Sequence, residues 1–197
     1  MLIDCGANTD CKPQYLQQFG VMASAYMQSV MGVDNPRISL LNNGEEAEKG
    51  CELTKAAYKL LSAAPINFAG NCEAREVLSG EFDALVCDGF VGNVVLKYTE
   101  GLASSMMAML KTELTADFKS KIGAALSMGA FRRFKKKMDY KEVGGAPLLG
   151  INGCVIKAHG SSDAKAFASA IRQAELFVKG NVNPKIAEAI ASLPDEE

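Results

Sequence analysis

The chain has 197 residues and carries 21 lysines and arginines against 23 aspartates and glutamates, so its formal net charge is −2. This near balance argues against a dedicated nucleic-acid-binding protein. Apolar residues make up 48% and charged residues 22% of the chain, close to globular averages, which excludes a disordered, collagen-like or coiled-coil chain.

Short β-rich runs alternate along the chain with longer helical patterns. The predicted strands are 1–4, 37–41, 66–69, 84–87 and 154–157. The predicted helices between the first four strands are 13–31, 46–63 and 73–78, and each ends close to a glycine or a proline. The strand 84–87 is apolar without alternation, which is typical of parallel strands covered by helices. The pattern predicts an α/β fold with a mainly parallel sheet.

Two helical stretches, 94–114 and 116–140, follow the fourth predicted strand with no strand between them. They predict a helical hairpin over 94–140 that projects from the sheet. We therefore expect residues 1–197 to form a single α/β domain with this hairpin as an appendage. Because the chain begins directly in a strand, we also expect it to be part of a larger fold.

The lack of a recognisable targeting signal and the pattern of cysteines indicate a reducing compartment. The sequence has neither a run of about 18 apolar residues that could span a membrane nor a secretory signal, so we expect a cytoplasmic protein. The six cysteines show no C-x-x-C pair and are interpreted as free thiols. A cysteine nucleophile is the alternative, and it is disfavoured because the only histidine could serve just one of them.

Four glycine-rich polar loops follow predicted strands and lead into helices. They are residues 4–13, 42–46, 88–93 and 159–163. Ligands of open α/β sheets bind outside the carboxyl ends of the strands, and helix N-termini suit phosphate groups. Each loop alone could serve turn geometry, but the four together predict a site for an anionic ligand.

Two basic side chains in or next to these loops are candidates for a catalytic or phosphate-binding role. His159 is the only histidine and lies at a predicted strand end beside glycine and hydroxyl groups, where it could act as a general base or a hydrogen-bond donor. Lys97 follows Asn93 by one helical turn and could face the same pocket. The alternatives are a structural histidine and a solvated helix lysine.

Common cofactor signatures are absent from the sequence. It has one histidine, scattered cysteines and no carboxylate cluster with ligand spacing, so no metal site is expected. It contains neither a Walker loop nor a G-x-G-x-x-G fingerprint, so nucleotide binding is not supported.

The hairpin contains a short basic amphipathic segment. Its residues are Phe131, Arg132, Arg133, Phe134, Lys135, Lys136, Lys137 and Met138. Such a segment can lie on an anionic membrane surface, with its aromatic side chains inserted and its cations near the headgroups. It can equally pack its apolar stripe on a partner helix or bind an acidic carrier protein.

The loops, read with their flanking residues, are long enough to compare with known proteins. The runs are Ile3-Asp4-Cys5-Gly6-Ala7-Asn8 with Asp10-Cys11-Lys12-Pro13, Leu40-Leu41-Asn42-Asn43-Gly44-Glu45-Glu46, Cys87-Asp88-Gly89-Phe90-Val91-Gly92-Asn93-Val94-Val95-Leu96-Lys97, and Gly144-Gly145-Ala146-Pro147-Leu148-Leu149-Gly150 through His159-Gly160-Ser161-Ser162. With these runs the chain resembles the PlsX-type phosphate acyltransferases of bacterial phospholipid synthesis over nearly its whole length.

The resemblance implies a Rossmann-like sheet, similar to the folds of phosphotransacetylases and isopropylmalate dehydrogenases. It implies transfer of a long-chain fatty acyl group from acyl carrier protein to inorganic phosphate, without a metal or organic cofactor. It also implies a homodimer in the cytoplasm, peripherally associated with the inner membrane face, which passes acyl phosphate to a glycerol-phosphate acyltransferase. Nucleic acid is not an expected partner.

Site roles follow from the resemblance and from loop position. The predicted catalytic residues are Asp88, Asn93, Lys97 and His159. The predicted substrate-binding residues are Asn8, Lys12, Gly44, Glu45, Gly89, Gly92 and Ser161. We expect phosphate to be held by helix N-termini with Lys97 or Lys12, while Asn8, Asn93 or His159 donates to the thioester oxyanion during direct attack.

The chain departs from the family pattern in two places. The N-terminal α/β block of the family is absent, and Asn43 stands where an apolar residue is more common. Two alternatives accompany the acyltransferase, and the first rests on the missing block. One is a truncated, inactive homologue that retains dimerisation and membrane binding, and the other is a phosphotransacetylase that uses acyl-CoA.

Overall fold

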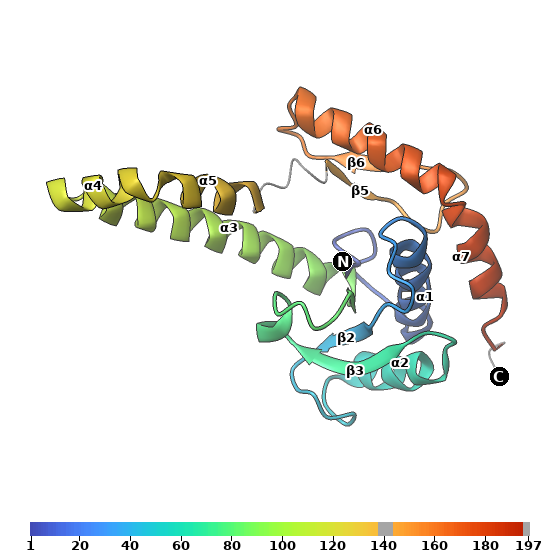
Figure 1. The fold of residues 1–197 in the computed structure, drawn as a ribbon. Helices are drawn as coiled ribbons and strands as arrows, with labels where there is room; N and C mark the ends of the chain where they lie inside the picture. Colours follow the sequence, from blue (N-terminus) through green and yellow to red (C-terminus); the bar gives the residue numbers. More distant parts are fainter. Residues whose placement is uncertain (138–143, 195–197) are drawn as a thin grey trace.

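A four-stranded parallel sheet lies at the centre of the molecule (Figure 1). The structure is a computed structural model that describes residues 1–137 and 144–194, with the side chains of 135–137 outside that description. The strands are β1 (Leu2–Ile3), β2 (Ile38–Asn42), β3 (Phe68–Glu73) and β4 (Ala84–Val86), in the order β1-β4-β2-β3. All three strand pairs are parallel, which confirms the predicted α/β fold with a mainly parallel, Rossmann-like sheet.

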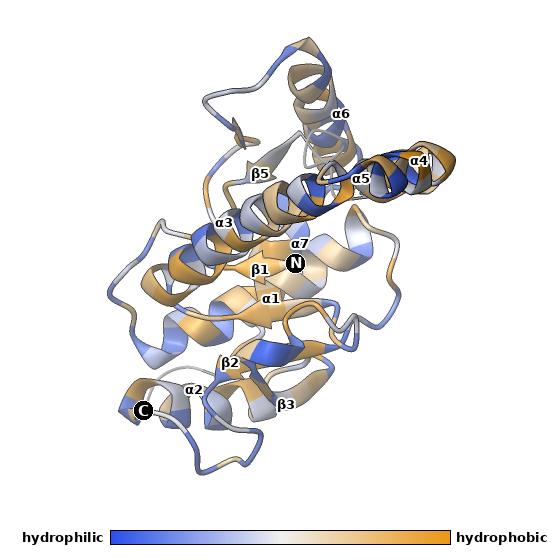
Figure 2. Ribbon diagram, turned by 90° about the vertical axis from the view of Figure 1, so that its left-hand side faces the viewer, coloured by the Kyte–Doolittle hydropathy of each residue, from blue (hydrophilic) through white to orange (hydrophobic). Residues whose placement is uncertain are grey.

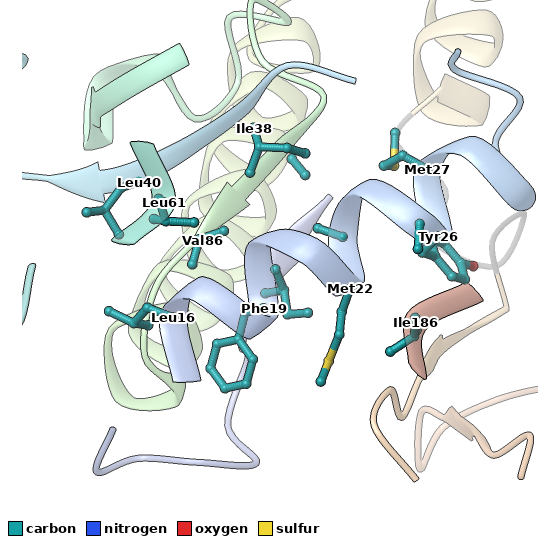
Figure 3. Close-up of a cluster of buried hydrophobic side chains, with 14 of the residues drawn as sticks. Leu16, Phe19, Met22, Tyr26, Met27, Ile38, Leu40, Leu61, Val86 and Ile186 are labelled. Atoms are coloured by element: carbon teal, nitrogen blue, oxygen red, sulfur yellow. The ribbon is translucent and has the colours of Figure 1, made fainter. Parts of the chain in front are cut away.

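The helix α1 (Pro13–Ser29) organises the hydrophobic core. Pro13 occupies its first turn, where the missing N–H costs no hydrogen bond. Every residue from Phe19 to Met27 is buried, because α1 packs against the sheet, α2 (Glu52–Ala63) and α7 (Val182–Ala191) on different sides. Figure 3 shows Leu16, Phe19 and Met22 of α1 among buried side chains from the sheet and the neighbouring helices.

Two predicted helix boundaries are wrong for local reasons. The helix predicted over 46–63 begins only at Glu52, because the Asn42 side chain holds the carbonyl of Lys49 and Gly50 adopts a φ of 97°. The helix predicted over 73–78 is a single 3-10 turn, η1 (Ala74–Glu76), since β3 continues to Glu73. Both segments are therefore loop structures at the rim of the sheet.

The fifth predicted strand does not join the main sheet. It forms β6 (Ile156–Ala158), which pairs antiparallel with β5 (Gly145–Pro147) in a separate two-stranded ribbon. The backbone hydrogen bonds of β6 are made with β5, and β6 therefore does not pair with a strand of the parallel sheet. The ribbon packs under α6 (Ala164–Lys179), which α7 follows.

A helical arm projects from the sheet (Figures 1 and 2). Its first helix, α3 (Gly89–Leu114), has 26 residues and is about 39 Å long. The second predicted helix, 116–140, is divided into α4 (Phe118–Leu126) and α5 (Met128–Lys137), which run back beside α3. We call α3, α4 and α5 the arm; residues 138–140 of the predicted hairpin lie outside the described residues.

Substitution of Leu61 tests the core directly. The Leu61 side chain is fully buried between α1 and the sheet, and a Cβ on Gly20 would come within 2.6 Å of its Cδ2 atom. We expect Leu61→Ala to lower the free energy of unfolding by about 2–5 kcal/mol, measured by urea denaturation. Leu78 is 77% exposed, so Leu78→Ala should change it by less than about 0.5 kcal/mol. An equal effect of the two substitutions would contradict this description of the core.

Candidate functional site

Three of the four predicted loops lie along one edge of the sheet. They follow β1, β4 and β2, which are neighbouring parallel strands whose carboxyl ends point the same way. The fourth loop, 159–163, follows β6 and therefore belongs to the separate ribbon. Three of the four predicted loops therefore lie at the strand ends of the main sheet, and the fourth does not.

The carboxylate of Asp4 organises the first loop. Asp4 is only 9% exposed, and its two oxygens accept the backbone N–H groups of Gly6 at 3.0 Å, Ala7 at 3.0 Å and Asn8 at 2.5 Å. The side-chain amide of Asn8 donates to the same carboxylate at 3.3 Å. Successive N–H groups of this kind form a concavity that binds anions. Here the protein's own carboxylate fills it, so these N–H groups are not available to phosphate.

The first and third loops are joined by direct contacts. The N–H of Gly89 donates to the carbonyl of Asn8 at 2.8 Å, and the side-chain amide of Asn93 donates to the carbonyl of Cys5 at 3.0 Å. A Cβ on Gly89 would collide with Asn8 and Asp4, and one on Gly92 would overlap the carbonyl of Asp4. Both glycines are therefore required for the close approach of α3 to the first loop.

The first turn of α3 is largely satisfied by its own residues. Asp88 is the N-cap, and its carboxylate accepts the N–H of Val91 at 2.8 Å. Only the N–H of Phe90 in this turn has no acceptor among the residues that the structure describes. Lys97 lies further along the exposed side of α3 and pairs with Glu100 at 3.1 Å. Asp88 thus has a capping role.

The loop after β2 is held in place by two asparagine side chains. Asn42 donates to the carbonyl of Lys49 at 3.2 Å, and the buried Asn71 donates to that of Glu46 at 2.7 Å. Gly44 is buried in this loop, where a Cβ would meet the Lys49 side chain at 2.7 Å. The exposed Glu45 pairs with Arg75 at 3.3 Å.

Lys12 is the basic side chain nearest in sequence to the Asp4 loop. It is exposed at the N-cap of α1, and its side chain makes no capping hydrogen bond. The following Pro13 has no N–H, so this helix start offers fewer backbone donors than the others. Lys12 therefore presents a cation beside the loop that Asp4 organises.

His159 and Ser161 form a small cluster of their own at the start of α6. The ring Nδ1 of His159 lies 2.7 Å from the Ser161 hydroxyl and accepts the N–H of Ser161 at 3.2 Å. An Nδ1 that accepts a backbone N–H leaves the ring hydrogen on Nε2 in the neutral form. Asp163 caps α6 by accepting the N–H of Ala166 at 3.0 Å.

The thiols near the Asp4 loop are poor nucleophiles. All six cysteines are free, as predicted. Burial raises the pKa of Cys5, Cys11 and Cys87, most strongly for Cys87, and raises the pKa of Cys72 to about 12. Cys51 is the exception: it is exposed at the N-cap of α2, where the backbone N–H of Thr54 lowers its pKa.

The predicted basic segment lies on α5. Arg132, Arg133 and Phe134 are exposed, and Phe131 is half-buried. Lys135, Lys136 and Lys137 continue the helix, whereas Met138 lies outside the described residues. No helix in the described part of the chain is both long enough and apolar enough to span a bilayer. In the same residues, no group of three or more histidine, cysteine, aspartate or glutamate side chains could hold a metal ion.

Sequence reasoning missed the two residues that hold these loops most firmly, Asp4 and Asn71. Asp4 had a recognisable signal, since an aspartate directly after a strand and before a Gly-Ala-Asn run favours side-chain bonds to the following N–H groups. Asn71 had none, because its contact with Glu46 joins residues 25 positions apart.

Comparison with known proteins assigns the chain to a family. The profile of a family described as fatty acid synthesis protein matches residues 1–185. The chain belongs to this family. Relatives named phosphate acyltransferase are 56% identical over 191 residues in Clostridium perfringens (strain SM101) and 51% identical over 197 residues in Alkaliphilus oremlandii. These names confirm the resemblance to PlsX-type phosphate acyltransferases.

The chain is shorter than these family members. The matches cover 96% and 100% of this chain, but only 56% of the Clostridium perfringens protein and 59% of the Alkaliphilus oremlandii protein. A third relative, the phosphate acyltransferase of Clostridium botulinum (strain Loch Maree), is 52% identical over 193 residues, which is 98% of this chain and 58% of that protein. The chain thus spans a little more than half the length of the relatives it matches.

Removal of the Asp4 carboxylate tests its role in the loop. Asp4→Ala leaves the N–H groups of residues 6–8 without their charged acceptor, so we expect the free energy of unfolding to fall by about 1.5–3 kcal/mol. Hydrogen exchange at the amides of residues 6–8 should accelerate as well. Asp10→Ala, an exposed change in the same loop, serves as the matched control. Unchanged exchange at residues 6–8 in Asp4→Ala would show that another group holds the loop.

Proposed function

We propose that this chain carries the reaction centre of a phosphate acyltransferase, which transfers a long-chain acyl group from acyl carrier protein to inorganic phosphate. The observation that supports the proposal is the meeting of three loops at one sheet edge, two of which are joined by hydrogen bonds from Gly89 and Asn93 to the loop that Asp4 organises. Family membership and the names of the relatives point to the same chemistry. The product would be an acyl phosphate for bacterial phospholipid synthesis.

Direct attack by phosphate fits the side chains available. A phosphate oxygen forms the new bond to the thioester carbonyl carbon, the C–S bond breaks, and the thiolate takes up a proton. We assign Lys12 and Lys97 to phosphate, together with the free N–H of Phe90 at the positive end of α3. Asn8 and Asn93 carry amide donors for the oxyanion, and the Nε2–H of His159 is a donor for the oxyanion or the leaving thiolate.

The protonated thiols support this route over a covalent acyl-enzyme. Cys5, Cys11 and Cys87 surround the Asp4 loop, but burial and the neighbouring carboxylates disfavour their thiolate forms, which are the nucleophilic ones. The reaction therefore needs a group that positions phosphate rather than a group that attacks.

A second copy of the chain and an anionic surface are the proposed partners of the arm. Val91, Tyr98, Leu102 and Met109 follow one another at intervals of seven, four and seven residues and form an exposed apolar face on α3, which suits a homodimer. Residues 118–137 contain seven lysines and arginines and no acidic residue. This charge suits peripheral contact with the cytoplasmic membrane face, where a glycerol-phosphate acyltransferase would use the product.

Phosphate-dependent release of carrier-protein thiol from long-chain acyl carrier protein tests the proposed reaction. We expect turnover by this chain, with losses of about 100-fold in His159→Ala and Lys97→Ala, since each removes a donor from the reacting groups. Lys111→Ala, on the outer part of α3, is the control and should retain activity.

The same assay on the Clostridium perfringens relative separates the possible failures. Turnover by the relative but not by this chain would reject the proposal for the chain on its own and favour the inactive homologue. Near-normal turnover in both His159→Ala and Lys97→Ala would reject their roles. Faster reaction with acyl-CoA than with acyl carrier protein would favour a phosphotransacetylase.

Sedimentation with vesicles of phosphatidylglycerol and phosphatidylcholine tests the role of the arm. We expect the chain to sediment at low salt and to lose binding at high salt and in the double variant Phe131→Ser, Phe134→Ser. Phe167→Ser, an exposed change on α6, is the control. Unchanged sedimentation of the double variant would reject α5 as the membrane contact.

A further inference from the structure

The helix α6 carries an apolar stripe that the fold does not bury. Its inner side packs on the β5–β6 ribbon and on α7, and the residues buried there are Ala166, Ser169, Ala170 and Phe177. On another side of the helix, Phe167 and Ile171 are each 60% exposed and Val178 is 66% exposed. They follow one another at intervals of four and seven residues, so they lie along one line of the helix. One apolar stripe suffices to pack a surface helix on its domain, and this second stripe is open to a partner.

A line of cations runs along the same helix. Lys165, Arg172 and Lys179 are separated by seven residues each, which places them within about 40° of one another around the helix axis. All three are exposed, and Lys179 pairs with the exposed Glu175 at 2.6 Å. Glu175 is the only acidic residue of α6, so the helix has three cations against one carboxylate, in a chain whose net charge is −2.

The apolar stripe and the line of cations share the exposed side of α6. A helix turns by about 100° per residue, so the two lines lie roughly 120° apart, and the buried residues occupy the remaining side. Figure 1 shows α6 lying over the β5–β6 ribbon, at the outside of the molecule. Apolar side chains bordered by charges are the usual composition of a protein interface, with an apolar centre and a polar rim.

The charge of α6 selects an acidic protein partner. Cations beside an apolar stripe are complementary to an amphipathic helix that carries carboxylates next to its own apolar side chains. An anionic bilayer is a better match for the arm, because residues 118–137 contain seven cations and no carboxylate. The helix α6 also begins at Ala164, only five residues after His159, which is the proposed donor to the leaving thiolate.

We propose that the exposed side of α6 is the docking surface for an acidic helix of acyl carrier protein. Arg172 and Lys179 bind its carboxylates, while Phe167 and Ile171 contact its apolar side chains. This proposal rests on the proposed function, in which acyl carrier protein is the acyl donor. The carrier protein and the membrane then use separate surfaces of the chain, α6 and the arm.

Fluorescence anisotropy with labelled holo acyl carrier protein from Clostridium perfringens tests the docking surface. Neither an acyl group nor phosphate is present, so binding is measured separately from the reaction. We expect the double variant Arg172→Glu, Lys179→Glu to bind at least about tenfold more weakly, and binding by the parent chain to weaken as salt is raised. Lys55→Glu, Lys59→Glu reverses two exposed lysines on α2 as the matched control and should bind as the parent chain does.

The apolar part of the surface is tested in the same assay. Phe167→Ser, Ile171→Ser should weaken binding about fivefold, because it removes apolar area that the partner would cover. Met31→Ser, Leu78→Ser is the matched control, with two exposed apolar side chains outside α6 and the arm. If thermal unfolding shows that one of the α6 double variants does not fold, the other decides alone.

Three outcomes would overturn the proposal. The first is no binding of holo carrier protein to the parent chain. The second is unchanged binding in the α6 variants with a loss in Arg132→Glu, Arg133→Glu, which would place the carrier protein on the arm. The third is a dimer that Phe167→Ser, Ile171→Ser separates without weakening carrier binding, which would assign the stripe to a second copy. Binding that depends on α6 in a chain without turnover would support the docking surface and reject only the reaction.

Discussion

The geometry of the candidate site depends on the buried carboxylate of Asp4. It holds three successive N–H groups of its own loop, and that loop in turn receives Gly89 and Asn93 from the start of α3. The close approach leaves no room for a side chain at Gly92. Asp4 therefore fixes the loop on which the start of α3 packs, next to the ends of β1 and β4. The internal carboxylate also limits phosphate binding to the donors and cations that surround this loop.

The helix α1 connects the two ends of the sheet. Its first residues, Lys12 and Pro13, lie beside the Asp4 loop, and its second half lies at the opposite edge, beside the segments that precede β2 and β3. Burial of nearly the whole middle of α1 makes it a rigid support, since each large buried side chain contributes about 1.5–3 kcal/mol. A rigid helix keeps both edges in a constant relation to each other and to α7, which packs on it.

The arm differs from the core in what stabilises it. Most of its large apolar side chains are exposed, among them Tyr98, Leu102 and Met109, although the arm begins at the tightest contact of the site. Burial therefore contributes little to the outer arm, and its backbone relies on helix hydrogen bonds and on the pairing of α3 with α4. A surface this apolar and this basic suits interaction with other molecules, whereas the buried core around α1 stabilises the fold.

The sequence by itself determined the fold class, the places of the first four strands along the chain and the glycine-rich loops that follow them, because these depend on local periodicity and on turn-forming residues. It also carried the family resemblance in those same loops. Only the tertiary structure decided that β6 leaves the main sheet, that Asp4 fills its own anion-binding loop and that Asn71 holds the loop after β2. Each of these depends on which groups meet across the fold, such as Asn71 with Glu46 or Gly92 with Asp4. The residues next to a position in the chain carry no information about the groups that packing brings to it. The contacts that require glycine at position 92 and aspartate at position 4 are therefore seen only in the folded chain.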